Sequence, residues 1–241
     1  KRIYLIISKK ERYLPTNQPI FHMKKTYYAI FALVIVAISC KKTDPSPVIA
    51  QNYMTLTAGS TWTYEITNNI TATTTTNTVS STNRDSTISG KAYHVFTNSN
   101  GAVNDYYNIT PGSAGNDYYT FRNLSAALPN TTIETVYLKD NAALGVSWSQ
   151  TENVALFSGV PTTVPVTITN TIAEKGVSRT VNGKVYSDVI RITTSLTSTA
   201  LPLGAIVTDI QSYYAPKYGL IESKNKIIVT TLLINTDQTT V

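Results

Sequence analysis

The feature that most constrains the fold is an alternation of apolar and polar residues with a period of two. Residues 61–67 read TWTYEIT, which places tryptophan, tyrosine and isoleucine on one face of an extended chain and threonine and glutamate on the other. The stretches 164–172 and 190–192 repeat this alternation, which is typical of half-buried β-strands. The residues around them are rich in Thr, Val, Ile and Tyr, and these types favour strands over helices.

Turn residues separate the alternating stretches. Asn182-Gly183 is a strong hairpin signal, and Asn98–Gly101, Pro111-Gly112 and Ser223–Asn225 are predicted to form further turns. Together the strands and turns predict an all-β fold with roughly ten short antiparallel strands. We expect a single antiparallel sheet domain, curved into a half-barrel or folded as a sandwich, after an N-terminal signal helix and a tether.

Residues 71–87 (TATTTTNTVSSTNRDST) are dominated by threonine and allow two interpretations. A biased polar composition is compatible with disorder, whereas the strand preference of threonine favours an exposed hairpin or a long solvent-facing strand pair. Both interpretations place this stretch outside the core.

The single cysteine of the chain, Cys40, follows an apolar run at 27–38 that is preceded by two lysines. A positive start, a short apolar middle and small residues are the parts of a secretory signal, and the run is shorter than the about 20 residues that a membrane-spanning helix needs. Residues 37–40 (AISC) resemble a bacterial lipobox, which implies cleavage between Ser39 and Cys40 and acylation of Cys40 with palmitate-type chains. A buried core cysteine is the alternative.

These observations divide the chain into four parts. Residues 1–22 lack a starting methionine and are interpreted as an over-extended start, with translation expected at Met23. Residues 23–39 form the predicted lipoprotein signal peptide. Residues 40–51 contain two prolines and form a lipidated tether of roughly 30 Å at about 3.1 Å per residue, and residues 52–241 form the β domain.

The basic charge of the chain belongs to its first part. The whole chain has 20 basic and 14 acidic residues, a net charge of +6. Seven of the basic residues and one of the acidic residues lie in 1–39, so 13 of each remain from Cys40 onward. A neutral mature chain does not favour nucleic acid as a partner.

A weak internal repetition links the two halves of the β domain. The motif Gly-x-x-Trp occurs at 59–62 and 145–148, Gly-Lys-Ala/Val-Tyr follows each copy, and doubled tyrosines follow in both halves. This order suggests two similar units at about 56–121 and 144–232. The alternative is that any succession of strands and turns with similar composition produces it.

Catalytic groups are few. The mature chain has one histidine, His94, which alternation places on the polar surface of a strand, and it lacks clusters with metal-ligand spacing and glycine-rich phosphate loops. A catalytic or metal site and a cofactor are therefore not expected. Glu65, Asp105 and Asp188 are candidate carboxylates for a glycoside hydrolase, the enzymatic alternative.

Aromatic residues are the other candidates for a binding site, because their flat faces and polar edges suit sugars and lipids. Trp62 and Trp148 each begin a strand after a glycine, and are expected to be mainly buried core residues, with ligand contact as the alternative. Each doubled tyrosine (106–107, 118–119 and 213–214) should place one ring in the core and leave the other exposed.

The chain resembles a group of Bacteroidota-type outer-membrane lipoproteins. The matching motifs are Gly-x-x-Trp-x-Tyr and Tyr-Ala-Pro-x-x-Gly-Leu, at Gly59, Trp62, Tyr64, Tyr214, Ala215, Pro216, Gly219 and Leu220. The resemblance implies the curved antiparallel sheet of periplasmic lipoprotein carriers and a lipid anchor in the outer membrane, facing the periplasm or the cell surface. It implies no particular activity.

The sequence therefore predicts a cell-envelope lipoprotein with a binding or scaffolding role. Its expected partners are the membrane, through the lipid, and a glycan, a lipid or another envelope protein. The alternatives are a carboxylate-dependent glycoside hydrolase and a lipid carrier with an apolar cavity.

Overall fold

The computed structural model describes residues 52–112, 115–123, 132–155, 163–230 and 233–241. The chain divides into two compact units, 1–48 and 49–241, and all of the described residues belong to the second. The predicted over-extended start, signal peptide and tether, with Ser39 and Cys40, all lie outside the described residues.

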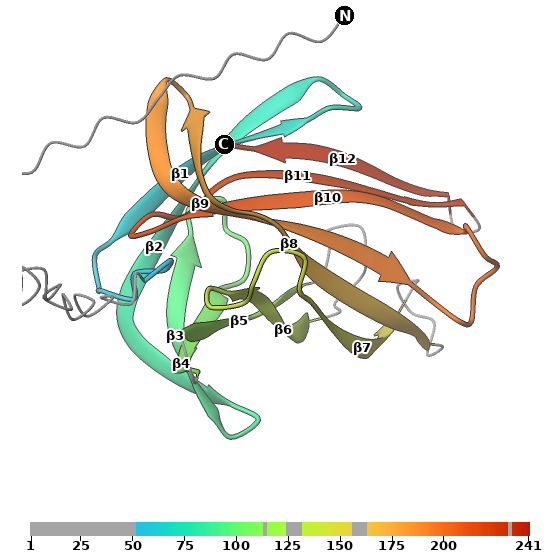
Figure 1. Cartoon of the computed structure of the whole chain (residues 1–241), viewed down its shortest axis with the longest axis horizontal. Coiled ribbons are helices and arrows are strands. Elements are labelled where there is room, and N and C mark those ends of the chain that lie inside the picture. Colours follow the sequence, from blue (N-terminus) through green and yellow to red (C-terminus); the bar gives the residue numbers. More distant parts are fainter. Residues whose placement is uncertain (1–51, 113–114, 124–131, 156–162, 231–232) are drawn as a thin grey trace, which may run out of the picture. The chain divides into compact units, whose positions relative to one another are not determined.

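The described chain folds into one antiparallel sheet of twelve strands (Figure 1). The strands are β1 (Thr61–Asn68), β2 (Thr73–Ile88), β3 (Lys91–Asn98), β4 (Asp105–Pro111), β5 (Asn116–Asn123), β6 (Thr132–Lys139), β7 (Ser147–Ala155), β8 (Thr163–Val181), β9 (Lys184–Thr197), β10 (Ile206–Ala215), β11 (Gly219–Val229) and β12 (Ile234–Thr240). The expectation of a single antiparallel all-β domain is confirmed.

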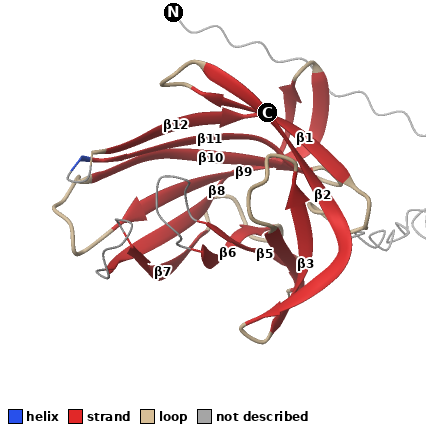
Figure 2. Ribbon diagram, turned by 180° about the vertical axis from the view of Figure 1, so that it is seen from behind, coloured by secondary structure: helices blue, strands red, loops and turns tan. Residues whose placement is uncertain are grey.

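The sheet curves around an interior space and nearly closes, so it is barrel-like rather than a sandwich (Figure 2). Its order is β6-β5-β4-β3-β2-β1-β12-β11-β10-β9-β8-β7, in which consecutive strands lie side by side except for β6 and β7. β1 pairs with β12, and Glu65 exchanges two backbone hydrogen bonds with Val241. The two ends of the domain are thereby joined, and the only break in this cycle of described strands lies between β6 and β7.

Side chains bridge the break between β6 and β7, which we call the seam. The indole nitrogen of Trp148 on β7 donates to the carbonyl oxygen of Val136 on β6 at 2.7 Å, and the amide of Asn170 on β8 donates to the same oxygen at 3.0 Å. Gln150 on β7 donates to the carbonyl of Glu134 at 2.5 Å. Because the edge carbonyls of β6 are satisfied in this way, the sheet closes without a backbone ladder at the seam.

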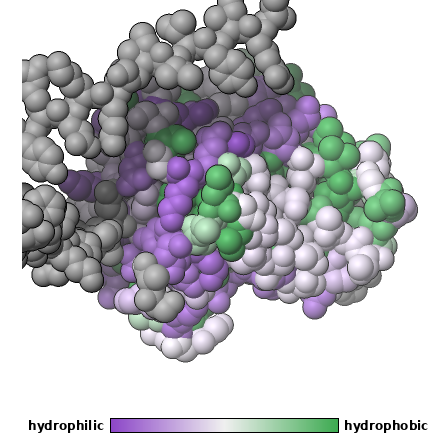
Figure 3. All heavy atoms as spheres, viewed as in Figure 1, coloured by the Kyte–Doolittle hydropathy of each residue, from purple (hydrophilic) through white to green (hydrophobic). Residues whose placement is uncertain are grey.

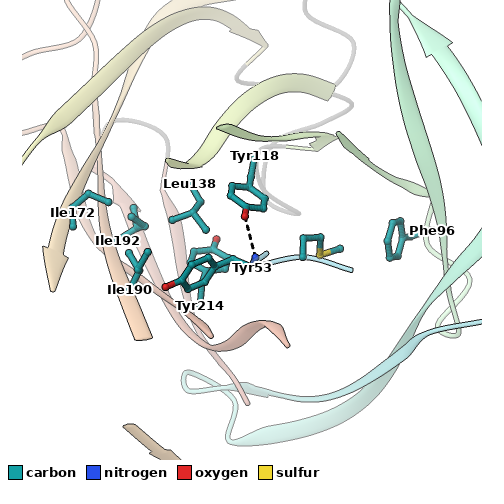
Figure 4. Packing of buried hydrophobic residues seen from close by; sticks show 9 residues of the cluster. Tyr53, Phe96, Tyr118, Leu138, Ile172, Ile190, Ile192 and Tyr214 are labelled. Atoms are coloured by element: carbon teal, nitrogen blue, oxygen red, sulfur yellow. Dashed lines mark hydrogen bonds between the residues drawn. The ribbon is translucent and has the colours of Figure 1, made fainter. Parts of the chain in front are cut away.

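The segment Asn52–Leu56, which we call the strap, runs through one end of the interior. Tyr53 and Met54 are buried in the main hydrophobic cluster, which Figure 4 shows with Ile190 and Tyr214 beside Tyr53 and with Phe96 on the far wall. The strap is held by polar contacts as well: the backbone amide of Lys217 donates to the carbonyl of Asn52 at 2.7 Å. The first described residues therefore close this end of the sheet.

The other end holds a second apolar cluster. Its buried members come from β6, β7, β8, β9 and β11 and comprise Ile133, Val154, Val166, Ile168, Leu196, Ile227 and Val229. Figure 3 shows apolar residues gathered at this end of the molecule, where the connections β9–β10 and β11–β12 lie. Leu203 and Leu233 in these connections are exposed.

Most of the turn predictions are confirmed, and one is wrong. Asn182 and Gly183 form the β8–β9 turn, and both have positive φ, as a tight hairpin requires. The stretch Asn98–Gly101 lies at the end of β3, and Pro111-Gly112 lies at the end of β4. Ser223–Asn225 does not turn, since it lies inside β11. Its polar residues signalled a turn, but in the structure they line part of the interior, where polar side chains are accommodated.

The threonine-rich stretch forms a strand, and its assignment entirely outside the core is wrong. β2 pairs with β1 and β3 along its length, with a register shift between Ser81 and Asp85. Its threonines are mainly exposed, but Asn77 and Ser81 are buried. They are buried because the sheet curves around them, which the strand composition alone does not reveal.

Candidate functional site

The interior of the sheet contains a cavity of about 410 Å³ and a smaller one of about 100 Å³. Both are lined by Arg122, Tyr137, Ile210, Ser212, Tyr214 and Asn225. Met54 of the strap lines the larger cavity at the closed end, and the exposed residues Asn100, Ala102 and Val103 of the β3–β4 connection also line it. The larger cavity is therefore closed by the strap and accessible beside the β3–β4 connection. Its volume lies within the range of about 300–1,000 Å³ that is usual for small-molecule sites.

Aromatic side chains from four strands form much of the wall of the larger cavity. They are Trp62, Tyr64, Tyr107, Tyr137 and Tyr214. Tyr137 contacts Tyr107 edge-on with ring centroids 6.0 Å apart, and its centroid lies 5.3 Å from that of Tyr214. Burial raises the pKa of each of these four tyrosines, so their hydroxyl groups remain protonated at neutral pH and can donate hydrogen bonds.

Arg122 is the principal charge in the cavity. It lies near the end of β5, and its neighbours include Tyr107 from β4, Tyr137 from β6 and Tyr214 from β10. Arg122 keeps an exposed surface, and because rings from three strands surround its side chain, we take that surface to face the cavity. None of the described carboxylates lies within 4.0 Å of its guanidinium group in an ion pair.

The charge of Arg122 is retained inside the cavity. Burial lowers the pKa of its guanidinium, but interactions with the neighbouring Tyr107 and Asp105 outweigh this effect, and the pKa is raised. Asp105 also lines the cavity and accepts a hydrogen bond from the Asn98 amide at 3.1 Å. The cavity therefore contains a cation that has an acid nearby but no direct counter-ion in the described chain.

Two polar atoms in the cavity wall lack hydrogen-bond partners within the described chain. They are the hydroxyl oxygen of Thr120, a residue with 1% relative exposure, and the buried amide oxygen of Asn225. Leaving a buried polar atom unpaired costs about 1–3 kcal/mol. Each of these atoms has less than 1 Å² of exposed surface, so both lie behind the cavity surface and not on it.

The predicted tryptophans are both partly buried rather than mainly buried. Trp62 lines the larger cavity while its indole nitrogen donates to the carbonyl of Tyr218 at 2.7 Å. Trp148 packs against the main cluster and bridges the seam. Trp62 therefore has both expected roles: its ring packs against the main cluster and also lines the cavity.

The doubled tyrosines place their rings on opposite faces of the sheet, as predicted. Tyr107, Tyr118 and Tyr214 point inward, where all three belong to or pack against the main cluster. The expectation that the second ring is exposed is wrong for Tyr213, which has 8% relative exposure. The guanidinium of Arg179 stacks 3.4 Å above its ring centroid and pairs with Glu222, so the outward face is covered here.

The three candidate carboxylates do not meet in the cavity. Glu65 is exposed on β1, and the backbone carbonyl of Asp188 accepts a hydrogen bond from the Tyr53 hydroxyl near the strap. Of the three, Asp105 alone lines the larger cavity. A hydrolase that uses two carboxylates needs both at the same substrate bond, and these residues do not provide that pair.

The prediction that His94 is a surface histidine is wrong. Its side chain has 14% relative exposure, because it lies on the same face of β3 as the buried Phe96. Its Nε2 lies 2.9 Å from the Ser81 hydroxyl and its Nδ1 lies 2.8 Å from an oxygen of Asp85. Alternation alone could not show this contact, because the register shift in β2 brings Ser81 and Asp85 to the same histidine.

The chain Ser81–His94–Asp85 has the order of groups found in serine hydrolases, but its serine is not accessible. Ser81 has 4% relative exposure, and its hydroxyl also lies 3.1 Å from the carbonyl of Leu56 in the strap. None of the three residues lines either cavity. We interpret the cluster as a polar link that fixes the strap to β2 and β3.

Two features are absent from the described residues. They contain no group of three or more His, Cys, Asp or Glu side chains arranged to hold a metal ion. Within the same residues, no helix has the length and apolar character to span a membrane.

Comparison with known proteins gives little beyond the structure itself. No family model and no curated protein matches the chain. Among solved structures, it is similar to a crystal structure described as a "putative lipoprotein" from Parabacteroides distasonis, with 11% identity and a TM-score of 0.39. That match covers 80% of this chain and 97% of the other. A similarity of this size does not identify a shared family.

Proposed function

We propose that this protein is a cell-envelope lipoprotein that binds a small organic ligand inside its curved sheet. The observation that carries the proposal is the cavity of about 410 Å³, which the strap closes at one end and aromatic and polar side chains line. Large concave sites with a few convergent polar groups are the usual places of ligand binding. The cavity wall supplies both kinds of group within one sheet.

The lipid anchor in this proposal rests on the sequence around Cys40. A single acyl chain gives only marginal membrane binding, whereas two or more chains anchor stably. The tether of residues 40–51 would then separate the lipid from the strap. In this arrangement the closed end of the sheet is the end connected to the membrane, and ligand enters beside the β3–β4 connection. The outer membrane is the proposed location.

Mass spectrometry of the protein purified from cells tests the anchor. We expect the mature chain to begin at an acylated Cys40, and we expect C40A to lose membrane association while the β domain still folds. An unmodified Cys40 thiol, or a chain that still contains Met23, would contradict the proposal.

Ligand binding is tested by screening glycans and lipids against the full protein, as the cell processes it, and against a variant with a filled cavity. Ser212 lines both cavities, so S212F should abolish binding of any interior ligand. S195F places the same ring at an exposed position on β9 and should bind normally. Unchanged binding by S212F, with folding confirmed by circular dichroism, would place the ligand elsewhere.

Scaffolding is the second possibility within the same class. Recovery of one stoichiometric envelope protein in a pull-down, together with no binding in either ligand screen, would favour it over the cavity.

A further inference from the structure

We propose that the ligand is a small aromatic carboxylic acid, bound as its anion, whose carboxylate pairs with Arg122 and whose ring lies against the neighbouring tyrosines. This inference rests on the proposed function, because it names the class of ligand that the same cavity would hold. Three observations carry it: an accessible cation without a partner, hydroxyl donors beside that cation, and ring faces whose polar edges are already bonded within the chain.

Arg122 is presented to the cavity. It follows Tyr118 and Thr120 at intervals of two on β5, and both of those side chains are buried on the inner face. Successive side chains of a strand alternate between its two faces, so Arg122 also points inward. Unlike the two residues before it, Arg122 keeps an exposed surface, and it lines both cavities. Its guanidinium therefore lies on the cavity surface and not behind it.

The guanidinium of Arg122 is free to pair with an anion. It forms no hydrogen bond or ion pair with the described residues. A guanidinium group presents its donors in a planar fork that matches a carboxylate in a two-point contact. Because the described chain supplies no carboxylate at this fork, a ligand can supply one.

The groups around Arg122 favour one negative charge. Arg122 interacts electrostatically with Tyr107, Tyr137 and Tyr214, and burial raises the pKa of all three hydroxyl groups. They therefore stay protonated at neutral pH and can donate to an anion held at Arg122. Asp105 also lies near Arg122 and would repel an anion, which disfavours a doubly charged phosphate more than a singly charged carboxylate.

The wall beside these groups favours an aromatic body over a sugar. The indole nitrogen of Trp62 and the hydroxyl of Tyr64 already donate to backbone carbonyls, at 2.7 and 3.1 Å. The amides of Asn77 and Asn98 are likewise bonded within the chain. These polar groups are engaged, whereas the ring faces of the cavity wall can still contact a ligand. Contact between aromatic rings is favourable beyond the burial of apolar area, so a flat ring should bind better than an acyl chain.

Isothermal titration calorimetry with four probes tests the inference on the full protein. The probes are cinnamate, its neutral amide cinnamamide, decanoate and D-glucuronate. We expect cinnamate to bind most tightly. R122Q should weaken cinnamate binding by about 10–100-fold, the usual effect of losing a charge-assisted pair, with little effect on cinnamamide.

Matched variants separate charge from general damage to the cavity, and circular dichroism checks that each variant folds. R84Q removes an arginine from an exposed position on β2 and should leave all affinities unchanged. D105N removes the acid near Arg122 and should tighten cinnamate binding selectively. R122K keeps the charge without the planar fork, and its affinity should lie between those of the unmodified protein and R122Q.

The outcomes distinguish this inference from the function on which it rests. Equal binding of cinnamate and cinnamamide, or equal cinnamate affinities for R122Q and the unmodified protein, would overturn the carboxylate pairing. Tighter binding of decanoate or glucuronate than of cinnamate would overturn the aromatic body while leaving a cavity ligand in place. If no probe binds, the aromatic-acid inference fails. If the glycan and lipid screen is also negative, the proposed ligand-binding function fails with it.

Discussion

At the scale of single residues, the Tyr118 hydroxyl is the most informative contact of the strap. It accepts a hydrogen bond from the backbone amide of Tyr53 at 3.0 Å (Figure 4). It also donates to an Asp140 carboxylate oxygen at 2.9 Å. Tyr118 is fully buried. Loss of this oxygen would leave the amide of Tyr53 without a partner, and an unpaired buried donor is costly.

We expect Y118F to lower the free energy of unfolding by about 1–3 kcal/mol, measured by urea denaturation. Limited proteolysis should also cut the strap more quickly in this variant. The matched control is Y119F on the next residue, which points outward from β5 and whose hydroxyl makes no hydrogen bond within the described chain; its effect should stay within about 0.5 kcal/mol. Equal losses for the two variants would show that the strap is not held through Tyr118.

At the scale of elements, the seam is the point where the sheet depends on side chains. Every other neighbouring pair of described strands shares a backbone ladder, whereas β6 and β7 are joined through Trp148, Gln150 and Asn170. Local opening occurs where few hydrogen bonds must break. The seam is therefore the part of the sheet that should open at the lowest free energy.

We expect W148F to destabilise the protein by about 0.5–1.5 kcal/mol, the usual net value of one hydrogen bond, and to accelerate amide hydrogen exchange in residues 133–138. The matched control is W62F, which removes an indole donor of the same 2.7 Å length at the Tyr218 carbonyl, away from the seam. Exchange in β6 should not change in that control. If both variants accelerate exchange in β6 equally, the seam is not a separate opening unit.

At the scale of the whole molecule, buried tyrosines link stability to alkaline pH. Burial raises the pKa of six of them, namely Tyr53, Tyr64, Tyr107, Tyr118, Tyr137 and Tyr214. For Tyr118 the pKa rises to about 12, against about 10 in an unfolded chain. Between these values the unfolded chain has released a proton that the folded protein still holds, so stability falls as pH rises.

We therefore expect the melting temperature to be insensitive to these groups below about pH 10 and to fall steeply from pH 10 to pH 12. Y64F removes one of the six, so its melting temperature should decline less over the same interval. A melting temperature that stays constant up to pH 11 would show that these hydroxyl groups ionise equally in the folded and unfolded states.

The sequence by itself determined the class of fold, because alternation and turns are local properties. The period of two in residues 61–67 and 164–172 predicts strands independently of the tertiary fold. Asn182-Gly183 forms a hairpin through its own backbone preferences. Local patterns failed at Ser223–Asn225, which lies within β11 and does not turn. Ser223 and Asn225 line the cavity, whereas the Lys224 ammonium pairs with Asp209. The predicted anchor at Cys40 remains a prediction from the local motif alone.

Only the tertiary structure decided where the chain places its candidate site. Arg122 carries no distinctive motif, and its importance comes from Tyr107, Tyr137 and Tyr214, which reach it from other strands. The closure of the sheet around them depends on the β1–β12 ladder and on the seam. These contacts join residues far apart in the sequence, so the cavity follows from the curvature and closure of the sheet and not from the pattern of any single strand.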